Sequence, residues 1–169
     1  LKNGYRAELL EESGVCFAIE GTQLAREGDG LRDRFRDRVV FPSQSTSGRV
    51  LGFGGRILDS QKKVAKYVNS PESPIYHKAK TLYGIHYAKS AQNQANNCYL
   101  VEGYTDVHQL HQRRNENVVS NNGTALQKYQ IRMNSHLCNT ITLKFDADQA
   151  ENRASMRSID LILAEGLNV

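Results

Sequence analysis

Tryptophan is absent from the sequence, and cysteine and proline are scarce, with three residues of each. Cys16, Cys98 and Cys138 are far apart and form no CxxC pair, which argues against a zinc ribbon or a disulfide framework. No apolar run approaches the roughly 20 residues that span a bilayer, and the N-terminus has no signal-peptide pattern. These absences predict a cytoplasmic protein without a membrane partner. Because the first residue is Leu1, we expect a piece of a longer chain.

Charge is distributed unevenly along the chain. The formal net charge is +4, but residues 31–66 carry nine Lys/Arg against three Asp/Glu, which is +6 locally and leaves −2 elsewhere. A basic segment joined to an acidic remainder favours a polyanion, such as a nucleic acid or a nucleotide, held beside a carboxylate site. A solvated charged surface has the same composition, so both interpretations stay open.

The sequence divides near residue 95. In the first half, "RVVFP" and "RVLGFGGRIL" flank the turn-forming "SQSTSGR" and predict antiparallel strands, while residues 80–94 are partly helical. The second half alternates: we expect strands at 98–101, 117–120 and 140–146, and helices at 105–114, 124–137 and 149–166. This alternation predicts an α/β fold with a parallel sheet flanked by helices, preceded by a basic mixed α/β part. In the last helix Met156, Ile159 and Leu163 predict one apolar stripe.

Acidic residues follow two of the expected strands. Glu102 ends the first strand, and "FDAD" places Asp146 and Asp148 at the end of the third. Ligands of open parallel sheets bind beyond the carboxyl ends of the strands, so these carboxylates are expected to converge, with Asp106 one helical turn away. Crowded carboxylates favour a hard cation, and all-oxygen ligands select Mg²⁺ or Mn²⁺, which indicates phosphoryl chemistry.

A local explanation competes with this metal site. Thr105 and Asp106 are good residues for opening a helix, and Asp146 and Asp148 could cap the last helix. A lone DxD is weak evidence for metal, but its pairing with "EGYTD" in a strand–helix frame strengthens the metal interpretation. For His108 and His111, three positions apart, a surface pair is favoured over a metal site.

The motifs "VEGYTD", "NGTAL" and "FDAD" resemble those of the Toprim domain, which primases, topoisomerases and some nucleases share. In the first half, "LRDRFRDRVVFP", "GRVLGFGGR", "KYVNSPESPIYHK" and "LYG" resemble, in order and spacing, the catalytic core of bacterial replicative primase, the DnaG family. The likeness runs from about Gly4 to the last residue. It implies two domains: 1–95 as the C-terminal part of the basic N-terminal subdomain, and 96–169 as a Toprim domain truncated at its C-terminal end.

The resemblance implies synthesis of short RNA primers on single-stranded DNA from ribonucleoside triphosphates, by attack of a 3′-hydroxyl on an α-phosphate. It implies two or more Mg²⁺ or Mn²⁺ ions, with Glu102, Asp146 and Asp148 as metal-site acids and Asp106 as a further acid. It also implies a bacterial, replisome-associated protein. Zinc and the replicative helicase would be bound by modules that lie before and after this segment.

Basic and polar residues match the template and nucleotide groove of the family: Arg34, Arg36, Arg38, Arg56, Lys66, Asn69 and Lys78. Arginine and lysine neutralise phosphates without reading bases. If "RDRFRDR" is extended, its arginines share one side, and if it is helical they scatter. Tyr67 could stack on a base, although a packing role is favoured.

Several residues depart from the family pattern. Ala147 and Glu151 stand at glycine positions, and Asn121 and Asn122 replace smaller residues. Thr142 and Lys144 are unexpected in a strand that should be buried on both faces. These departures leave the activity open. Two alternatives therefore stand beside a primase core: a Toprim nuclease or topoisomerase fragment, and a catalytically weakened single-stranded-DNA-binding module.

Overall fold

The computed structural model describes residues 4–19, 30–59, 64–145 and 149–169, with only the backbone for 149–155. The chain forms two compact units, Leu1–Pro42 with Leu51–His77 and Ser43–Val50 with Lys78–Val169. Residues 78–95 therefore pack with the C-terminal unit. None of the helices in the described ranges is long and apolar enough to cross a membrane.

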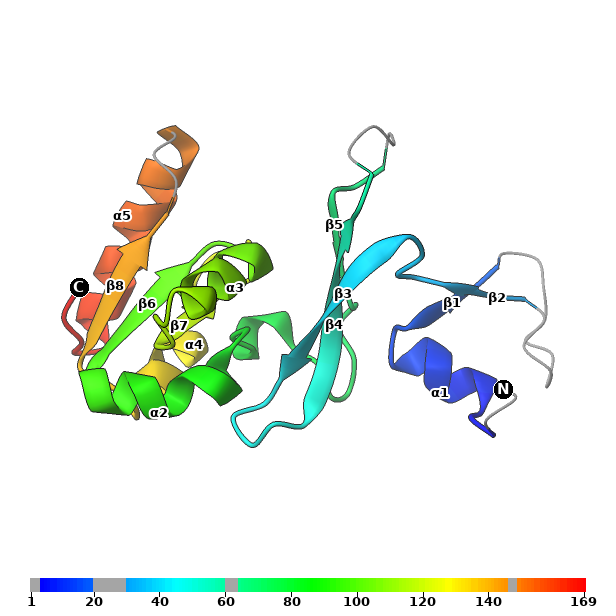
Figure 1. The fold of residues 1–169 in the computed structure, drawn as a ribbon, viewed down its shortest axis with the longest axis horizontal. Helices are drawn as coiled ribbons and strands as arrows, with labels where there is room; N and C mark the ends of the chain where they lie inside the picture. The colour runs from blue at the N-terminus through cyan, green and yellow to red at the C-terminus, as the bar shows by residue number, and fades with distance from the viewer. Residues whose placement is uncertain (1–3, 20–29, 60–63, 146–148) are drawn as a thin grey trace. The chain divides into compact units, whose positions relative to one another are not determined.

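The first unit is built mainly from antiparallel strands (Figure 1). Helix α1 (Ala7–Glu12) precedes β1 (Cys16–Ala18), which pairs antiparallel with β2 (Leu31–Asp33). A three-stranded sheet has the order β3 (Arg38–Gln44), β4 (Val50–Ile57) and β5 (Tyr67–Asn69). Most of it belongs to this unit, but the β3–β4 turn and the adjoining strand ends, Ser43–Val50, are part of the second unit. The turn between β3 and β4 is closed by a bond from Gly48 N–H to the Ser45 carbonyl at 3.0 Å. The predicted hairpin is confirmed.

The arginine-rich run between β2 and β3 is neither extended nor helical. Residues 34–37 form turns, and Asp37 has a φ of 54°, in the left-handed region. Asparagine and aspartate tolerate this conformation better than most residues. Because the chain turns here, the expected alternation does not apply to Arg34, Arg36 and Arg38.

The second unit contains a parallel sheet in the order β7-β6-β8. Its elements follow the predicted alternation (Figure 1): 3-10 helix η1 (Lys78–Lys80), α2 (Ile85–Ala95), β6 (Asn97–Val101), α3 (Tyr104–Gln112), β7 (Val118–Ser120), α4 (Lys128–Ser135), β8 (Thr140–Lys144) and α5 (Gln149–Ala164). Tyr83 joins the sheet through two backbone bonds with Ser120, at 2.8 and 3.0 Å. Gly84 then starts α2 with a φ of 86° and lies so close to Val118 that a Cβ would be 3.1 Å from its carbonyl oxygen.

The two faces of this sheet are covered differently. One face carries Leu100 and Ile141, which form the main core with Ile131 of α4 and Ile162 of α5. The other face carries Val101, and α3 lies against it (Figure 1). At the end of β8, Lys144 is exposed. The expectation that this strand is buried on both faces is therefore wrong at its carboxyl end.

Two helix predictions need correction. Helix α4 starts at Lys128 instead of 124, because Gln127 N–H bonds to the Gln130 side chain at 3.0 Å and sets the N-terminus there. In α5 the predicted stripe is wrong, since Met156 and Leu163 are 61% and 56% exposed while Ile162 is fully buried. Apolar residues occur at four of the five positions 159–163, so several stripes fit the sequence equally well.

Candidate metal and nucleotide site

Glu102 is held at the carboxyl end of β6 by its backbone. Its carbonyl accepts a hydrogen bond from Ser120 Oγ at 2.7 Å and one from Gly123 N–H at 3.0 Å. These bonds tie the β6–α3 junction to the loop after β7. The backbone position of Glu102 is therefore fixed by two neighbouring strand ends, as expected for a ligand site of a parallel sheet.

Asp106 has a local role in opening α3. Its Oδ2 accepts a hydrogen bond from Gly103 N–H at 3.0 Å, three residues earlier. This bond satisfies a backbone donor that has no partner within the helix, and the negative charge is favourable at a helix N-terminus. The local explanation for Asp106 is confirmed, although it does not exclude a second role at the adjoining pocket.

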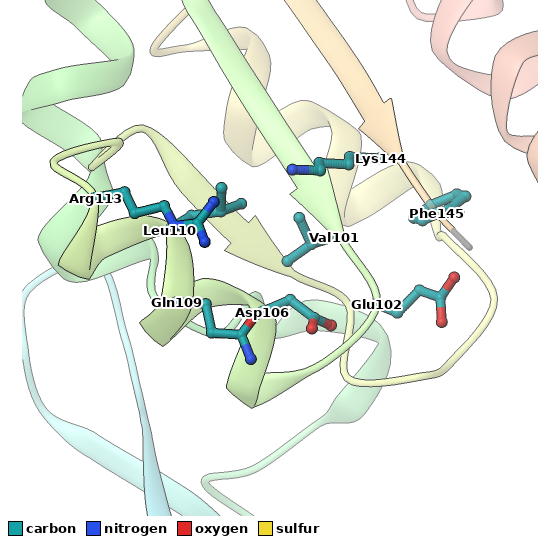
Figure 2. A pocket seen from close by; sticks show the side chains of 8 residues that line it. All are labelled: Val101, Glu102, Asp106, Gln109, Leu110, Arg113, Lys144 and Phe145. Atoms are coloured by element: carbon teal, nitrogen blue, oxygen red, sulfur yellow. The ribbon is translucent and has the colours of Figure 1, made fainter. Parts of the chain in front are cut away.

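A pocket of about 250 Å³ lies between α3 and the ends of β6 and β8 (Figure 2). Its lining residues are Val101, Glu102, Asp106, Gln109, Leu110, Arg113, Lys144 and Phe145. The α3 members are spaced as one helical face. Figure 2 shows the carboxylate of Glu102 pointing away from Asp106, toward the side of Phe145. The pocket therefore brings two predicted acids together on one lining without directing them at one point.

Glu102 also lines a second pocket of about 540 Å³. Its walls come from the loop after β7, with Asn121 and Thr124, and from α5, with Arg157 and Leu161. The buried Asn121 donates its side-chain N–H to the Thr124 carbonyl at 2.6 Å, and Thr124 Oγ1 donates to the Asn121 carbonyl at 2.7 Å. The unexpected asparagine thus shapes the loop that forms this wall.

Of the four acids predicted for the metal site, only Glu102 and Asp106 lie within the described residues. Within the described ranges, no group of three or more His, Cys, Asp or Glu side chains could hold a metal ion. The predicted ligands Asp146 and Asp148, together with Ala147, lie outside the described residues. Phe145, the residue directly before them, lines both pockets with Glu102. Glu102 therefore supplies one carboxylate of the kind that a hard divalent cation prefers as a ligand.

The basic residues predicted to bind nucleic acid are divided among different environments. Arg34 Nε donates to the Gly14 carbonyl at 2.8 Å, and its guanidinium lies 5.6 Å from the Phe17 ring centre. Arg38 donates to the carbonyls of Gly55, Ala65 and Lys66 at 2.8–3.3 Å. These two arginines support the fold of the first unit. Arg36 is exposed.

Arg56, Tyr67 and Asn69 lie on one face of the β4–β5 pair. Arg56 is directly opposite Tyr67 in the antiparallel register, and Asn69 follows two positions later on the same side. The guanidinium of Arg56 and the ammonium of Lys66 lie 5.7 and 5.9 Å from the Tyr67 ring centre. Tyr67 therefore packs between cations while remaining 37% exposed, so the structure is compatible with both roles considered for it.

The opposite face of this strand pair is occupied by Arg38. A Cβ on Gly55 would lie 2.7 Å from the Phe35 ring and 3.0 Å from Arg38 Cδ, so only glycine fits there. Because Gly55 and Arg56 alternate in β4, Arg38 and Arg56 cover opposite faces. Lys78 belongs to η1 in the other unit. Within the first unit, the predicted basic residues therefore do not all share one face of the strand pair.

His108 is exposed, as the preferred surface interpretation predicts, and it also bonds to a tyrosine. Its Nε2 lies 2.8 Å from Tyr83 Oη. Desolvation, followed by the nearby His111, lowers the pKa of His108 from its ordinary value. Desolvation, followed by Tyr87, raises the pKa of Tyr83 to about 12. Both side chains of this hydrogen-bonded pair are therefore uncharged at neutral pH.

Sequence reasoning missed two residues of the smaller pocket. The sequence marks Lys144 only as an unusual strand residue and does not by itself point to Arg113. The signal for Arg113 was its spacing, since positions 106, 109, 110 and 113 fall on one face of a helix. Arg157 of the larger pocket had no comparable signal, because its helix was assigned the wrong buried face.

Comparison with known proteins agrees with this architecture. Residues 2–89 match the family described as DNA primase catalytic core, N-terminal domain, and residues 99–169 match the Toprim-like family. The DNA primase of Halalkalibacterium halodurans is 43% identical over 150 residues, which is 88% of this chain and 25% of that protein. The chain spans about a quarter of the length of such curated relatives.

Solved primase structures have the same fold. The Aquifex aeolicus primase, comprising zinc-binding and RNA polymerase domains, superposes with a TM-score of 0.83 at 34% identity, covering 95% of this chain and 38% of that one. A DnaG primase catalytic domain bound to single-stranded DNA gives 0.79 at 33% identity, covering 92% and 46%. The match over residues 2–89 does not favour the nuclease or topoisomerase alternative. The chain belongs to the DnaG-type DNA primase family, with part of the catalytic core followed by a Toprim-like domain.

Proposed function

We propose that this chain is part of the catalytic core of a bacterial primase, which joins ribonucleotides on a single-stranded DNA template. The observation that carries the proposal is the position of Glu102 at the carboxyl end of β6, lining both pockets, in a chain with both primase and Toprim-like matches. We keep the division at residue 95 as a proposal for where the primase-specific and Toprim parts meet.

Glu102, Asp146 and Asp148 are proposed to hold Mg²⁺ or Mn²⁺, and Toprim-type primases depend on divalent metal ions. Such ions supply charge stabilisation for the attacking and leaving oxygens. Glu102 is suited to this role because hydrogen bonds fix its backbone. Asp106 supports the site by fixing the start of α3, so that it orients the adjoining helix face.

In the proposed reaction the 3′-hydroxyl oxygen of one nucleotide forms a bond to the α-phosphorus of the next, and the bond to pyrophosphate breaks. No protein nucleophile is required. Arg36, Arg56, Lys66, Asn69 and Lys78 are proposed to contact template or nucleotide phosphates, and Tyr67 to stack on a base. Arg34 and Arg38 are proposed to contribute mainly by holding the first unit in shape and by their charge.

The proposed partners are single-stranded DNA and ribonucleoside triphosphates. Solved relatives support the first, since one DnaG catalytic domain is described as bound to single-stranded DNA. A replicative helicase and zinc would be bound by modules outside this chain. The proposed location is the bacterial cytoplasm at the replisome.

The test compares Glu102→Gln with Glu116→Gln, a control that removes the same charge from an exposed loop residue. Mn²⁺ binding to the chain is measured by electron paramagnetic resonance, and dinucleotide formation is assayed with single-stranded DNA, ribonucleotides and Mn²⁺. We expect Glu102→Gln to weaken Mn²⁺ binding about tenfold or more and to reduce product in parallel, because a first-coordination carboxylate is lost. Unchanged Mn²⁺ affinity in Glu102→Gln would show that the proposed site is wrong.

A further inference from the structure

Two cationic side chains line the smaller pocket. Arg113 comes from the end of α3 and Lys144 from the end of β8, and both line the pocket with Glu102 and Asp106. Figure 2 shows the Arg113 guanidinium and the Lys144 ammonium directed toward one another across Leu110 and Val101. The pocket therefore has a cationic end, formed by Arg113 and Lys144, and carboxylates elsewhere on its lining.

Neither cation is engaged in an ion pair in the part of the chain that the structure describes. The ion pairs that the structure records join His77 to Glu72 and Arg132 to Glu165, and within the described ranges neither Arg113 nor Lys144 forms one. Because both cations line the pocket and neither is in an ion pair within the described ranges, both can donate charge-assisted hydrogen bonds to an anion bound there. Gln109 adds a neutral amide donor to the same lining.

The size of the pocket restricts the anion. Its volume of about 250 Å³ is below the ~300–1,000 Å³ typical of pockets that enclose a whole organic ligand. A phosphate or pyrophosphate group fits within this volume, whereas the sugar and base of a nucleotide would extend beyond the pocket. A cationic end beside carboxylates is complementary to a phosphate that also carries a divalent cation.

We propose that Arg113 and Lys144 form a subsite for the pyrophosphate group, either as the tail of a bound triphosphate or as the released product. The proposal rests on the proposed function, because pyrophosphate is the leaving group of that reaction. In this proposal the exposed charge of Lys144 at the end of β8 has a function, because its ammonium binds the anion in the pocket. The arginine provides a planar fork for phosphate oxygens, and the lysine provides a mobile point charge.

The test is calorimetric titration of the chain with inorganic pyrophosphate, first in EDTA and then in MgCl₂. We expect binding in both buffers, tighter with Mg²⁺. Lys144→Ala and Arg113→Ala should each weaken it about tenfold or more, the loss typical for a charged hydrogen bond. Lys144→Arg should retain most of the affinity. Arg114→Ala is the matched control, because it removes an exposed neighbouring arginine that does not line the pocket.

Each outcome has a distinct meaning. Wild-type pyrophosphate affinity in both alanine variants, or no binding by the unaltered chain, overturns the subsite. The subsite is also overturned if the two alanine variants bind a single-stranded oligonucleotide more weakly but bind pyrophosphate with unchanged affinity. That result would assign the two cations to template phosphates. Failure of the proposed function gives a different result, because Mn²⁺ affinity would then be insensitive to Glu102→Gln while the lysine-dependent pyrophosphate binding remained.

Discussion

Ile162 and Leu163 are adjacent in α5 and similar in volume, but the fold treats them differently. Ile162 is fully buried against the β6–β8 sheet, whereas Leu163 is 56% exposed. Replacing Ile162 by alanine removes buried methyl groups and leaves a cavity, so we expect it to lower the free energy of unfolding by about 3 kcal/mol. Leu163→Ala should cost less than about 0.5 kcal/mol, because little buried area is lost and alanine favours the helix.

The assay is urea denaturation of both variants, followed by far-UV circular dichroism, with amide hydrogen exchange of β6 as a local measure of the second unit. Exchange at Leu100 should accelerate in Ile162→Ala and stay unchanged in Leu163→Ala, since Leu100 shares the core cluster with Ile162. If Leu163→Ala were as destabilising as Ile162→Ala, the buried face of α5 described above would be refuted, and the stripe through Met156 and Leu163 would be correct instead.

Two further changes test other parts of the structure. Arg38→Lys should lower the free energy of unfolding, measured by urea denaturation, by about 1–2 kcal/mol. The reason is that one ammonium cannot replace a guanidinium that donates to three carbonyls. The control Arg36→Lys should change the free energy of unfolding by less than about 0.3 kcal/mol. The pKa of His108 lies below its ordinary value in the folded state, so its contribution to stability is present above about pH 6.5 and is lost as the pH falls through the folded-state pKa. His108→Asn should therefore flatten the decline of the urea midpoint between about pH 7 and pH 5; an unchanged decline would contradict this assignment.

The sequence predicted most of the second unit because its strands are short apolar runs and its helices begin at recognisable signals. Glu102 was located correctly, since a residue that follows an apolar strand is fixed by the strand itself. The face of α5 could not be predicted, because consecutive apolar residues permit more than one stripe. The turn at 34–37 could not be predicted either, since charged residues alternating with one phenylalanine fit a strand, a helix or a turn.

The arginine-rich run shows why counting charges does not identify phosphate ligands. Arg34 and Arg38 are cationic side chains, so both contribute to the long-range attraction of a polyanion. Their donors, however, are directed at backbone carbonyls of the first unit, and redirecting them to phosphates would break those hydrogen bonds. We therefore propose that Arg36, Arg56 and Lys66 make the direct phosphate contacts of this segment. All basic residues of this segment thus attract a polyanion at a distance, but only some of them have donors that are available to contact it. The structure is needed to tell these two groups of residues apart.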